Sequence, residues 1–183
     1  MLFNAWFAGE HGEWCKHTNF ELATHAPMMV HIPGKTDNGV VTEQLTEFVD
    51  LFPTLVDAAG LPPLPLCPRD SSHIRLCREG TSLMPLVTDP TATSWKKRVF
   101  SQYPRGGNIM GYSMRTERYR YTKWVKFDHK TYTPDWSKSS GTELYDHVTD
   151  PEENDNVAGK PEFKATVAGL SKMLHAGWRS SVR

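Results

Sequence analysis

A segment near the start of the sequence gathers side chains that could do chemistry. Residues 9–17 read Gly-Glu-His-Gly-Glu-Trp-Cys-Lys-His, which places two carboxylates, two imidazoles, a thiol and an ammonium within nine positions. The two glycines favour a bent backbone that can approach a ligand closely. An ammonium on such a bend can hold a sulfate or phosphate oxygen as a point charge, so we expect Lys16 to contact an anion. A solvated loop whose charges cancel is the alternative.

Two other kinds of site in this segment are less well supported. The carboxylates Glu10 and Glu13 could act as an acid and base pair, but we favour hydrogen-bond acceptors that orient the loop. A zinc site is not predicted, because the spacing of the histidines and the cysteine matches no common zinc-finger pattern. These residues are His11, Cys15, His17, His25 and His31.

A second group of charges lies further along the chain. Basic residues alternate with aromatic ones between positions 115 and 126 and could form a cationic sheet edge facing an anionic sugar polymer. Ordinary alternation on an exposed sheet face explains them equally well. The residues are Arg115, Arg118, Arg120, Lys123 and Lys126.

Composition excludes several classes of function. The 183 residues include 21 basic and 21 acidic side chains, so the formal net charge is zero. This balance disfavours nucleic acid or a membrane surface as a partner. No run of eighteen or more apolar residues predicts a transmembrane helix, and no secretory signal is visible. The length is sufficient to bury a real core.

The cysteines allow one local cross-link. Cys67 and Cys77 flank a polar loop and could form a disulfide, in which case Cys15 would have no cysteine to pair with. Two buried thiols in a reducing compartment are the alternative.

The elements that position these residues fall into two parts, and we place the boundary so that 1–94 and 95–183 form separate domains. The apolar run at 26–34 predicts a buried strand. Apolar residues at three- and four-residue steps predict a helix from a cap at Thr42 to Gly60. Pro53 either divides this helix or lies in the first turn of its second half. Residues 80–86 predict one or two helical turns.

The second part has the pattern of an antiparallel sheet. Aromatic and β-branched runs at 98–103, 109–115 and 119–125 are separated by turn residues and predict a meander. Residues 143–146 could add an edge strand. Apolar residues at helical spacing predict a closing helix over 161–178.

Several short motifs also occur in one order along nearly the whole chain. They lie at residues 9–16, 24–27, 48–55, 76–80, 101–105, 110–116 and 119–122. Together they resemble the sulfatase family. The resemblance implies an α/β fold: the C-terminal part of an alkaline-phosphatase-like sulfatase core, followed by a small antiparallel β subdomain with a closing helix.

The resemblance also implies a function. Such enzymes are sulfuric ester hydrolases, and here the implied substrate is a glycosaminoglycan such as heparan or dermatan sulfate, degraded in the lysosome with calcium as cofactor. Lys16 matches a lysine that contacts the sulfate. Substrate binding is implied for Trp6, His11 and Arg105, and the loop at 76–80 resembles a disulfide-bonded region of the family, which supports pairing of Cys67 with Cys77.

The sequence departs from the family pattern at the reacting centre. No C-x-P-x-R motif for the nucleophile occurs, and Phe-Asn-Ala at 3–5 replaces the Asp-His-Gly that supplies metal ligands. One neutral amide oxygen at Asn4 would hold calcium weakly, so we assign no metal ligand and expect no calcium binding by this chain alone. The loop between Arg105 and Ile109 is also short for the family.

These departures lead to three hypotheses. The first is that the chain is a fragment of a sulfatase, inactive alone and partnered by the N-terminal half of such an enzyme. The second is a non-catalytic module that binds sulfated glycan through Lys16, Arg105 and the basic strands. The third is a half-domain that needs a partner chain to fold, because unpaired strand edges and apolar faces would stay open.

Overall fold

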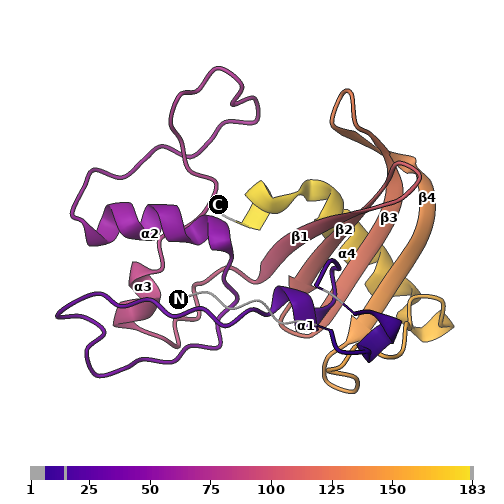
Figure 1. The fold of residues 1–183 in the computed structure, drawn as a ribbon, viewed down its shortest axis with the longest axis horizontal. Helices are drawn as coiled ribbons and strands as arrows, with labels where there is room; N and C mark the ends of the chain where they lie inside the picture. The colour runs from indigo at the N-terminus through magenta and orange to yellow at the C-terminus, as the bar shows by residue number, and fades with distance from the viewer. Residues whose placement is uncertain (1–6, 15, 182–183) are drawn as a thin grey trace. The chain divides into compact units, whose positions relative to one another are not determined.

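The computed structural model describes residues 7–14 and 16–181 and divides the chain into two compact units (Figure 1). The sheet unit combines residues 1–29 with 100–177, and the helix unit combines residues 30–99 with 178–183. The change between units at 99 and 100 lies near the predicted boundary at 94 and 95, whereas residues 1–29 group with the sheet. The predicted domains at 1–94 and 95–183 remain a prediction.

The sheet unit contains the predicted meander. Its strands run in the order β1 (Arg98–Arg105), β2 (Ile109–Thr116), β3 (Tyr119–Asp128) and β4 (Thr133–Asp146). The pairs β2/β3 and β3/β4 are antiparallel. The last strand is longer than the predicted edge strand at 143–146, because its first half continues the ladder beyond a bulge near Val125.

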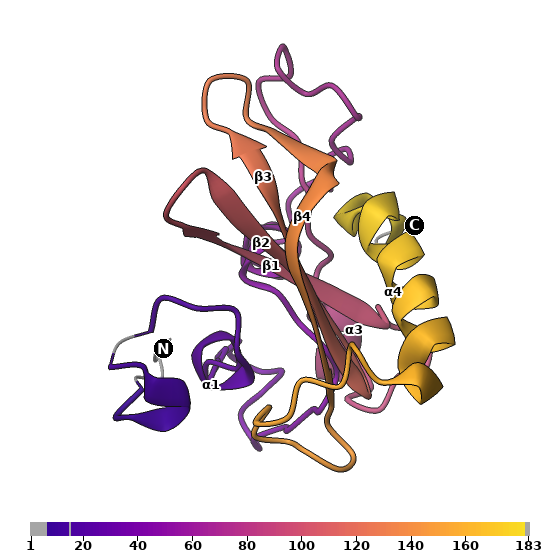
Figure 2. The ribbon, with the colours of Figure 1, turned by 90° about the vertical axis from the view of Figure 1, so that its right-hand side faces the viewer.

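The closing helix covers one face of this sheet (Figure 2). The helix α4 (Lys164–Ala176) follows a 3₁₀ turn at Pro161–Phe163 and ends at Gly177, whose positive φ of 76° suits glycine. The predicted helix at 161–178 is therefore confirmed over most of its length. The buried residues of this core are Met114, Tyr121, Leu144, Val157, Leu170 and Leu174.

The opposite sheet face is polar and carries the N-terminal segment (Figure 2). This segment contains the 3₁₀ turn η1 (Glu10–Gly12) and the short helix α1 (Glu21–Thr24). Asn19, which is 3% exposed, fastens it: its amide donates to the Gly111 carbonyl oxygen and its side-chain oxygen accepts from the Ser101 hydroxyl, both at 3.1 Å. Alternation along the strands therefore separates an apolar face from a face of polar contacts.

The helix unit contains η2 (Phe48–Asp50), α2 (Leu51–Ala58), α3 (Met84–Thr88) and the 3₁₀ turn Trp178–Ser181. The predicted cap at Thr42 is wrong, since its hydroxyl donates to the Pro90 carbonyl oxygen instead. A capping box between Glu47 and Asp50 precedes the helix. Pro53 lies in the first turn, where the absence of its N–H costs no intrahelical bond.

The predicted strand at 26–34 is wrong. Its described residues form extended chain and a turn, in which the amides of Lys35 and Thr36 donate to the Ile32 carbonyl oxygen. The run satisfies the strand pattern, but a strand forms only where a neighbouring chain completes the ladder.

Within the described residues, no helix is both long and apolar enough to cross a membrane.

The helix unit also contains the Cys67–Cys77 disulfide, with Cα atoms 4.9 Å apart. Two backbone hydrogen bonds close the base of this loop: the Cys67 amide donates to the Arg78 carbonyl oxygen, and the Arg78 amide donates to the Pro65 carbonyl oxygen, each at 2.9 Å. The loop is therefore closed both covalently and by hydrogen bonds.

We expect removal of this cross-link to destabilise the helix unit. Closing so short a loop restricts the unfolded chain, so the variant Cys67→Ser/Cys77→Ser is expected to lose about 2–3 kcal/mol of unfolding free energy. Peptide mapping without reductant after secretory expression, combined with urea unfolding, measures both the bond and its effect. Cys15→Ser is the control. Finding Cys67 and Cys77 as free thiols would contradict the assignment.

Candidate functional site

The charged loop at residues 9–17 is shaped by its own backbone. The Gly12 amide donates to the Gly9 carbonyl oxygen at 3.0 Å, and the Glu13 amide donates to the Glu10 carbonyl oxygen at 2.9 Å. Both glycines have positive φ, which the bend requires. The Glu10 carboxylate accepts from the Ala8 amide at 2.6 Å, and this bond lowers the pKa of Glu10. Glu10 is therefore an orienting acceptor, as predicted.

Two predicted site residues of this region are described by the structure. The exposed His11 ring stacks on Phe20 with centroids 4.2 Å apart, and an edge of Phe7 approaches it at 5.8 Å. Lys16 is half-buried. Trp6, also predicted to bind substrate, lies outside the described residues. The functional roles of all three remain predictions.

Arg105 connects the loop to the sheet. One nitrogen of its guanidinium, Nη2, donates to Oε1 of Glu13 at 2.9 Å. The guanidinium carbon lies 5.3 Å from the ring centroid of Tyr103 and 5.4 Å from that of Trp124, within the range of cation–π contacts. The side chain is 42% exposed, and its Nε and Nη1 donate no hydrogen bond to a described residue. Arg105 is thus held in place, while two of its nitrogen donors make no hydrogen bond to a described residue.

Trp124, which the sequence did not single out, is fixed in turn by two neighbours. Its indole nitrogen donates to Glu143 Oε1 at 2.7 Å. Its ring lies against Gly111 on the paired strand, where an added Cβ would come within 2.5 Å of the indole. Burial raises the pKa of Glu143, although the hydrogen bond from Trp124 opposes this. Alternation along the paired strands β3 and β4 places the side chains of Trp124 and Glu143 on the same face of the sheet.

Glu13 has one oxygen that is not satisfied. Its Oε1 accepts from Arg105, whereas its Oε2 is buried and has no hydrogen-bond partner among the described residues. A buried acceptor without a donor carries a free-energy cost, while the contact with Arg105 satisfies the other oxygen. The ring of His17 stacks on Tyr103 with centroids 6.0 Å apart, which extends the aromatic surroundings of Arg105.

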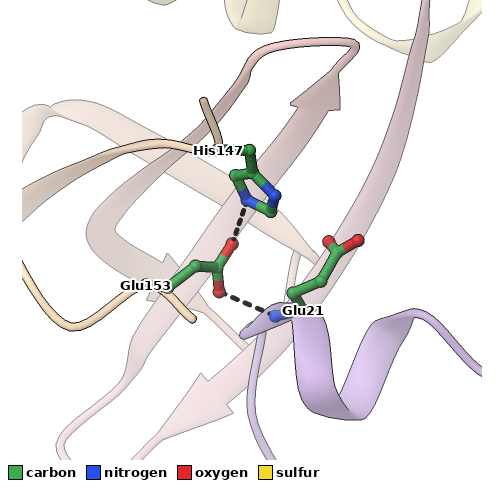
Figure 3. Close-up of side chains that lie close together, drawn as sticks. All are labelled: Glu21, His147 and Glu153. Atoms are coloured by element: carbon green, nitrogen blue, oxygen red, sulfur yellow. Dashed lines mark hydrogen bonds and ion pairs between the residues drawn. The ribbon is translucent and has the colours of Figure 1, made fainter. Parts of the chain in front are cut away.

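A second cluster of charged side chains joins α1 to the chain that follows β4 (Figure 3). Ligand atoms of Glu21, His147 and Glu153 lie within 4.8 Å of one another. His147 Nε2 lies 2.7 Å from Glu153 Oε1, and Glu153 Oε2 accepts from the Glu21 amide at 2.7 Å. Arg120, 2% exposed, donates to both Glu21 and Glu153.

Glu21, Glu153, His147 and Arg120, which we call the buried charge cluster, hold α1 on the sheet. Burial opposes ionisation of Glu21, but the hydrogen bond with His25 and the charges of Arg120 and Arg115 outweigh it and hold the pKa of Glu21 well below its usual range. Arg115 Nη2 lies 2.9 Å from His147 Nδ1; because a guanidinium only donates, Nδ1 accepts and Nε2 carries the proton toward Glu153.

The hypothesis of a cationic sheet edge is therefore wrong in part. Arg115 and Arg120 are neutralised by Glu21 and Glu153, and Arg118 pairs with Asp146 at 2.6 Å. Their partners lie 28 to 99 positions away along the chain, so alternation along one strand cannot reveal them.

Calcium does not fit the groups present. The cation needs six to eight oxygen ligands, and positions 3–5 offer one neutral side-chain oxygen. The cluster of Glu21, His147 and Glu153 is occupied by the guanidinium groups of Arg115 and Arg120, which would repel a divalent cation. We therefore derive no step through calcium.

Comparison with known proteins shows the family of this chain. A sequence model of the family described as N-sulphoglucosamine sulphohydrolase, C-terminal, matches residues 9–179. The chain is 36% identical to iduronate 2-sulfatase of Mus musculus and 34% identical to that of Homo sapiens, in each case over 84% of this chain and 36% of the relative. It therefore spans little more than a third of the length of these relatives.

Solved structures agree on the fold. A structure described as a complex with its substrate D-glucosamine-2-N,6-O-disulfate aligns with a TM-score of 0.69 at 24% identity, over 93% of this chain and 31% of that one. The phosphonate monoester hydrolase of Agrobacterium radiobacter aligns with a TM-score of 0.68 at 22% identity, over 94% and 32%. With the family match over residues 9–179, these findings identify the chain as a member of the sulfatase family that carries its C-terminal domain.

Proposed function

We propose that this chain forms the substrate-facing C-terminal part of a sulfuric ester hydrolase that acts on sulfated glycosaminoglycan, such as heparan or dermatan sulfate. The observation that carries the proposal is Arg105, which Glu13, Tyr103 and Trp124 hold in place while its Nε and Nη1 donate to none of the described residues. A guanidinium presents planar paired donors that match the oxygens of a sulfate group.

The other residues predicted to contact the substrate are proposed to add to this site. Lys16 would provide a second positive charge from the charged loop, and His11 and Trp6 would contribute ring surfaces for the sugar. A sulfated sugar bound there would replace none of the internal pairs of the buried charge cluster, since these are satisfied by one another. Substrate affinity and the stability of α1 thus depend on different residues.

We also propose that these 183 residues alone bind glycan without turnover. The nucleophile motif of the family is missing from the sequence, and neither positions 3–5 nor the cluster of Glu21, His147 and Glu153 offers the oxygen ligands that calcium needs. The partner that would supply both is the N-terminal portion of a sulfatase. The relatives named above lead us to propose the lysosome as the location of the complete enzyme.

Arg105→Ala tests the binding site. Because charge-assisted hydrogen bonds to sulfate would be lost, we expect affinity for heparan or dermatan sulfate to fall by about 10- to 100-fold. We also expect the affinity of the unmodified protein to fall with rising salt. Titration calorimetry or surface plasmon resonance at several salt concentrations measures both effects.

Arg118→Ala is the matched control for this experiment. Arg118 is likewise exposed, lies 4.9 Å from the ring of Tyr119 and pairs with a carboxylate, Asp146. An equal loss of affinity in the two variants, or affinity that does not depend on salt, would overturn the assignment of Arg105.

A non-catalytic module that binds sulfated glycan is the second candidate, favoured by the missing nucleophile motif. Complementation separates the two. If the N-terminal portion of a sulfatase is added and calcium-dependent sulfate release appears, the chain is part of an enzyme. Sulfate release by these 183 residues alone would contradict the proposal that they bind without turnover.

A further inference from the structure

A cleft lies at the end of the sheet where the β1–β2 turn meets the β3–β4 hairpin (Figure 2). Its volume is about 490 Å³, which is within the range of ligand sites, roughly 300–1,000 Å³. We call it the hairpin cleft and define it by its lining, which is Asn108, residues 126–130, residues 133–135 and Lys138. Most of these side chains are polar or charged, so the cleft suits a charged ligand better than an apolar one.

An irregularity of β4 accompanies this cleft. The ladder between β2 and β3 is regular as far as Lys126. Between β3 and β4, by contrast, Val125 lies opposite Ser139 and the next residue, Lys126, lies opposite Asp135, so the ladder skips residues 136–138. Because a bulge bends the strand that contains it, the hairpin departs from a flat ladder at the position where the cleft lies.

Three ammonium groups and two carboxylates line the cleft, and both carboxylates are engaged within the hairpin. Asp128 accepts from the backbone amide of Lys130 at 2.8 Å. Asp135 accepts from the Ser137 amide at 3.1 Å and forms an ion pair with the Lys138 ammonium, also at 3.1 Å. The charge of Lys138 is therefore offset within the cleft.

Lys126 and Lys130 provide the positive charge that remains. Both side chains are exposed, and neither ammonium makes an ion pair or a hydrogen bond with a described residue. Two ammonium groups thus face the single charge of Asp128. An ammonium is a mobile point charge with three donors, which suits the oxygens of a sulfate or a carboxylate. The hairpin cleft can therefore take an anionic group.

Lys126 also connects the cleft to the sheet face that carries Arg105. It follows Trp124 by two positions in the regular β2/β3 ladder, so the two side chains lie on one face with Cα atoms about 7 Å apart. Trp124 is the ring that the Arg105 guanidinium approaches. Asn108, three positions after Arg105, accepts at its carbonyl oxygen from the Phe127 amide at 2.7 Å. A chain-like ligand on Arg105 can therefore extend into the cleft.

We propose that the hairpin cleft binds a second anionic group, a sulfate or a uronate carboxylate, of the same glycosaminoglycan chain that Arg105 holds. This inference rests on the proposed function and deepens it, because it makes affinity depend on the length of the glycan. Once the first group is bound, the second is held at a high effective concentration. The protein therefore binds an oligosaccharide more tightly than a disaccharide.

The double variant Lys126→Gln/Lys130→Gln tests the proposal in the 183-residue chain. The probes are a sulfated disaccharide and a hexasaccharide, both derived from heparin and titrated by calorimetry. We expect the unmodified protein to bind the hexasaccharide at least about tenfold more tightly than the disaccharide. In the variant we expect hexasaccharide affinity to fall about tenfold and to depend less steeply on salt, since two ionic contacts are lost. Disaccharide affinity and the thermal midpoint should stay unchanged.

Lys164→Gln/Lys172→Gln is the matched control. It removes the same charge from two exposed lysines of α4, which covers the other face of the sheet (Figure 2). Equal affinity of the unmodified protein for the two probes would overturn the proposal, as would an equal loss in the control. Weaker disaccharide binding by the Lys126 and Lys130 variant would place these lysines at the Arg105 site instead. A lowered thermal midpoint would show that they stabilise the hairpin, and either result would also overturn the proposal.

A third probe distinguishes the two anions. It is a hexasaccharide whose sulfates are confined to one terminal disaccharide. A gain with length that persists for this probe and is lost in the double variant identifies a carboxylate in the cleft. A gain that appears only with the fully sulfated hexasaccharide identifies a sulfate. Both results support an anion site, whereas a gain that the double variant retains contradicts it.

Failure of this proposal and failure of the proposed function give different results. If Arg105→Ala leaves disaccharide affinity unchanged, the glycan site at Arg105 is wrong. If Arg105→Ala weakens disaccharide binding as expected, but the Lys126 and Lys130 variant binds the hexasaccharide like the unmodified protein, only the assignment of the hairpin cleft fails.

Discussion

Arg120→Ala is expected to lower the unfolding free energy of the sheet unit by about 3–5 kcal/mol. The guanidinium is 3% exposed and pairs with Glu153, which is 1% exposed, and with Glu21. Its removal leaves two carboxylates close together without their main counter-charge. A buried carboxylate that loses its counter-charge costs far more unfolding free energy than the loss of the same ion pair at the surface. Urea unfolding followed by tryptophan fluorescence gives the free energy.

Arg118→Ala provides the comparison, because Arg118 lies two positions away on the same segment but is 52% exposed. Its ion pair with Asp146 is accessible to water, so the expected loss is at most about 1 kcal/mol. Similar losses in the two variants would show that burial does not determine the strength of these pairs. The Arg120 variant should also expose α1 to proteolysis, since both Glu21 and the Thr24 hydroxyl accept from this arginine.

Lys96→Met is expected to have an effect of similar size in the helix unit, again about 3–5 kcal/mol. The ammonium is 2% exposed and lies 2.8 Å from both oxygens of Asp50, which is fully buried. Methionine retains an apolar stem of similar length but leaves the Asp50 carboxylate with only the backbone donors of Glu47 and Thr81. The loss should appear as a lower midpoint of urea unfolding.

Lys97→Met is the control for this variant, since the neighbouring lysine is exposed. Its expected effect is within about 0.5 kcal/mol. A double variant, Lys96→Met/Asp50→Asn, also removes the charge of Asp50 and should recover part of the loss, because the fully buried carboxylate is then neutral and only the less buried Glu47 has lost the ion pair with Lys96. If Lys96→Met is as stable as Lys97→Met, the pair does not stabilise the helix unit.

The elements that sequence predicts well are those with strong local patterns. Alternation over 98–125 predicted the meander, and apolar spacing over 161–178 predicted α4, because each pattern is repeated along one continuous stretch. The apolar run at 26–34 has an equally clear pattern, but among the described residues it forms only an isolated bridge at Met28. Its neighbour in a ladder would have to come from another segment, and local pattern carries no information about that segment.

The candidate site divides in the same way. Glycine spacing predicted the bent loop around Glu10, and its backbone bonds are local. The contact of Glu13 with Arg105 joins residues 92 positions apart. The sequence did not single out Trp124, although it lies on the same face of the sheet as Arg105. The signal that could have found it is Gly111 at the paired position, which leaves space for a large ring.

The sequence by itself determined the family, the disulfide candidate, the meander and the closing helix, because ordered motifs and local periodicity carry that information. Only the tertiary structure decided which charges are available to a ligand. It neutralised Arg115 and Arg120 internally and left two donors of Arg105 without a partner among the described residues. It also decided that α2 shows its apolar side outward, with Phe52 and Leu55 exposed. Both outcomes depend on partners distant along the chain, whose positions are set by packing rather than by local sequence.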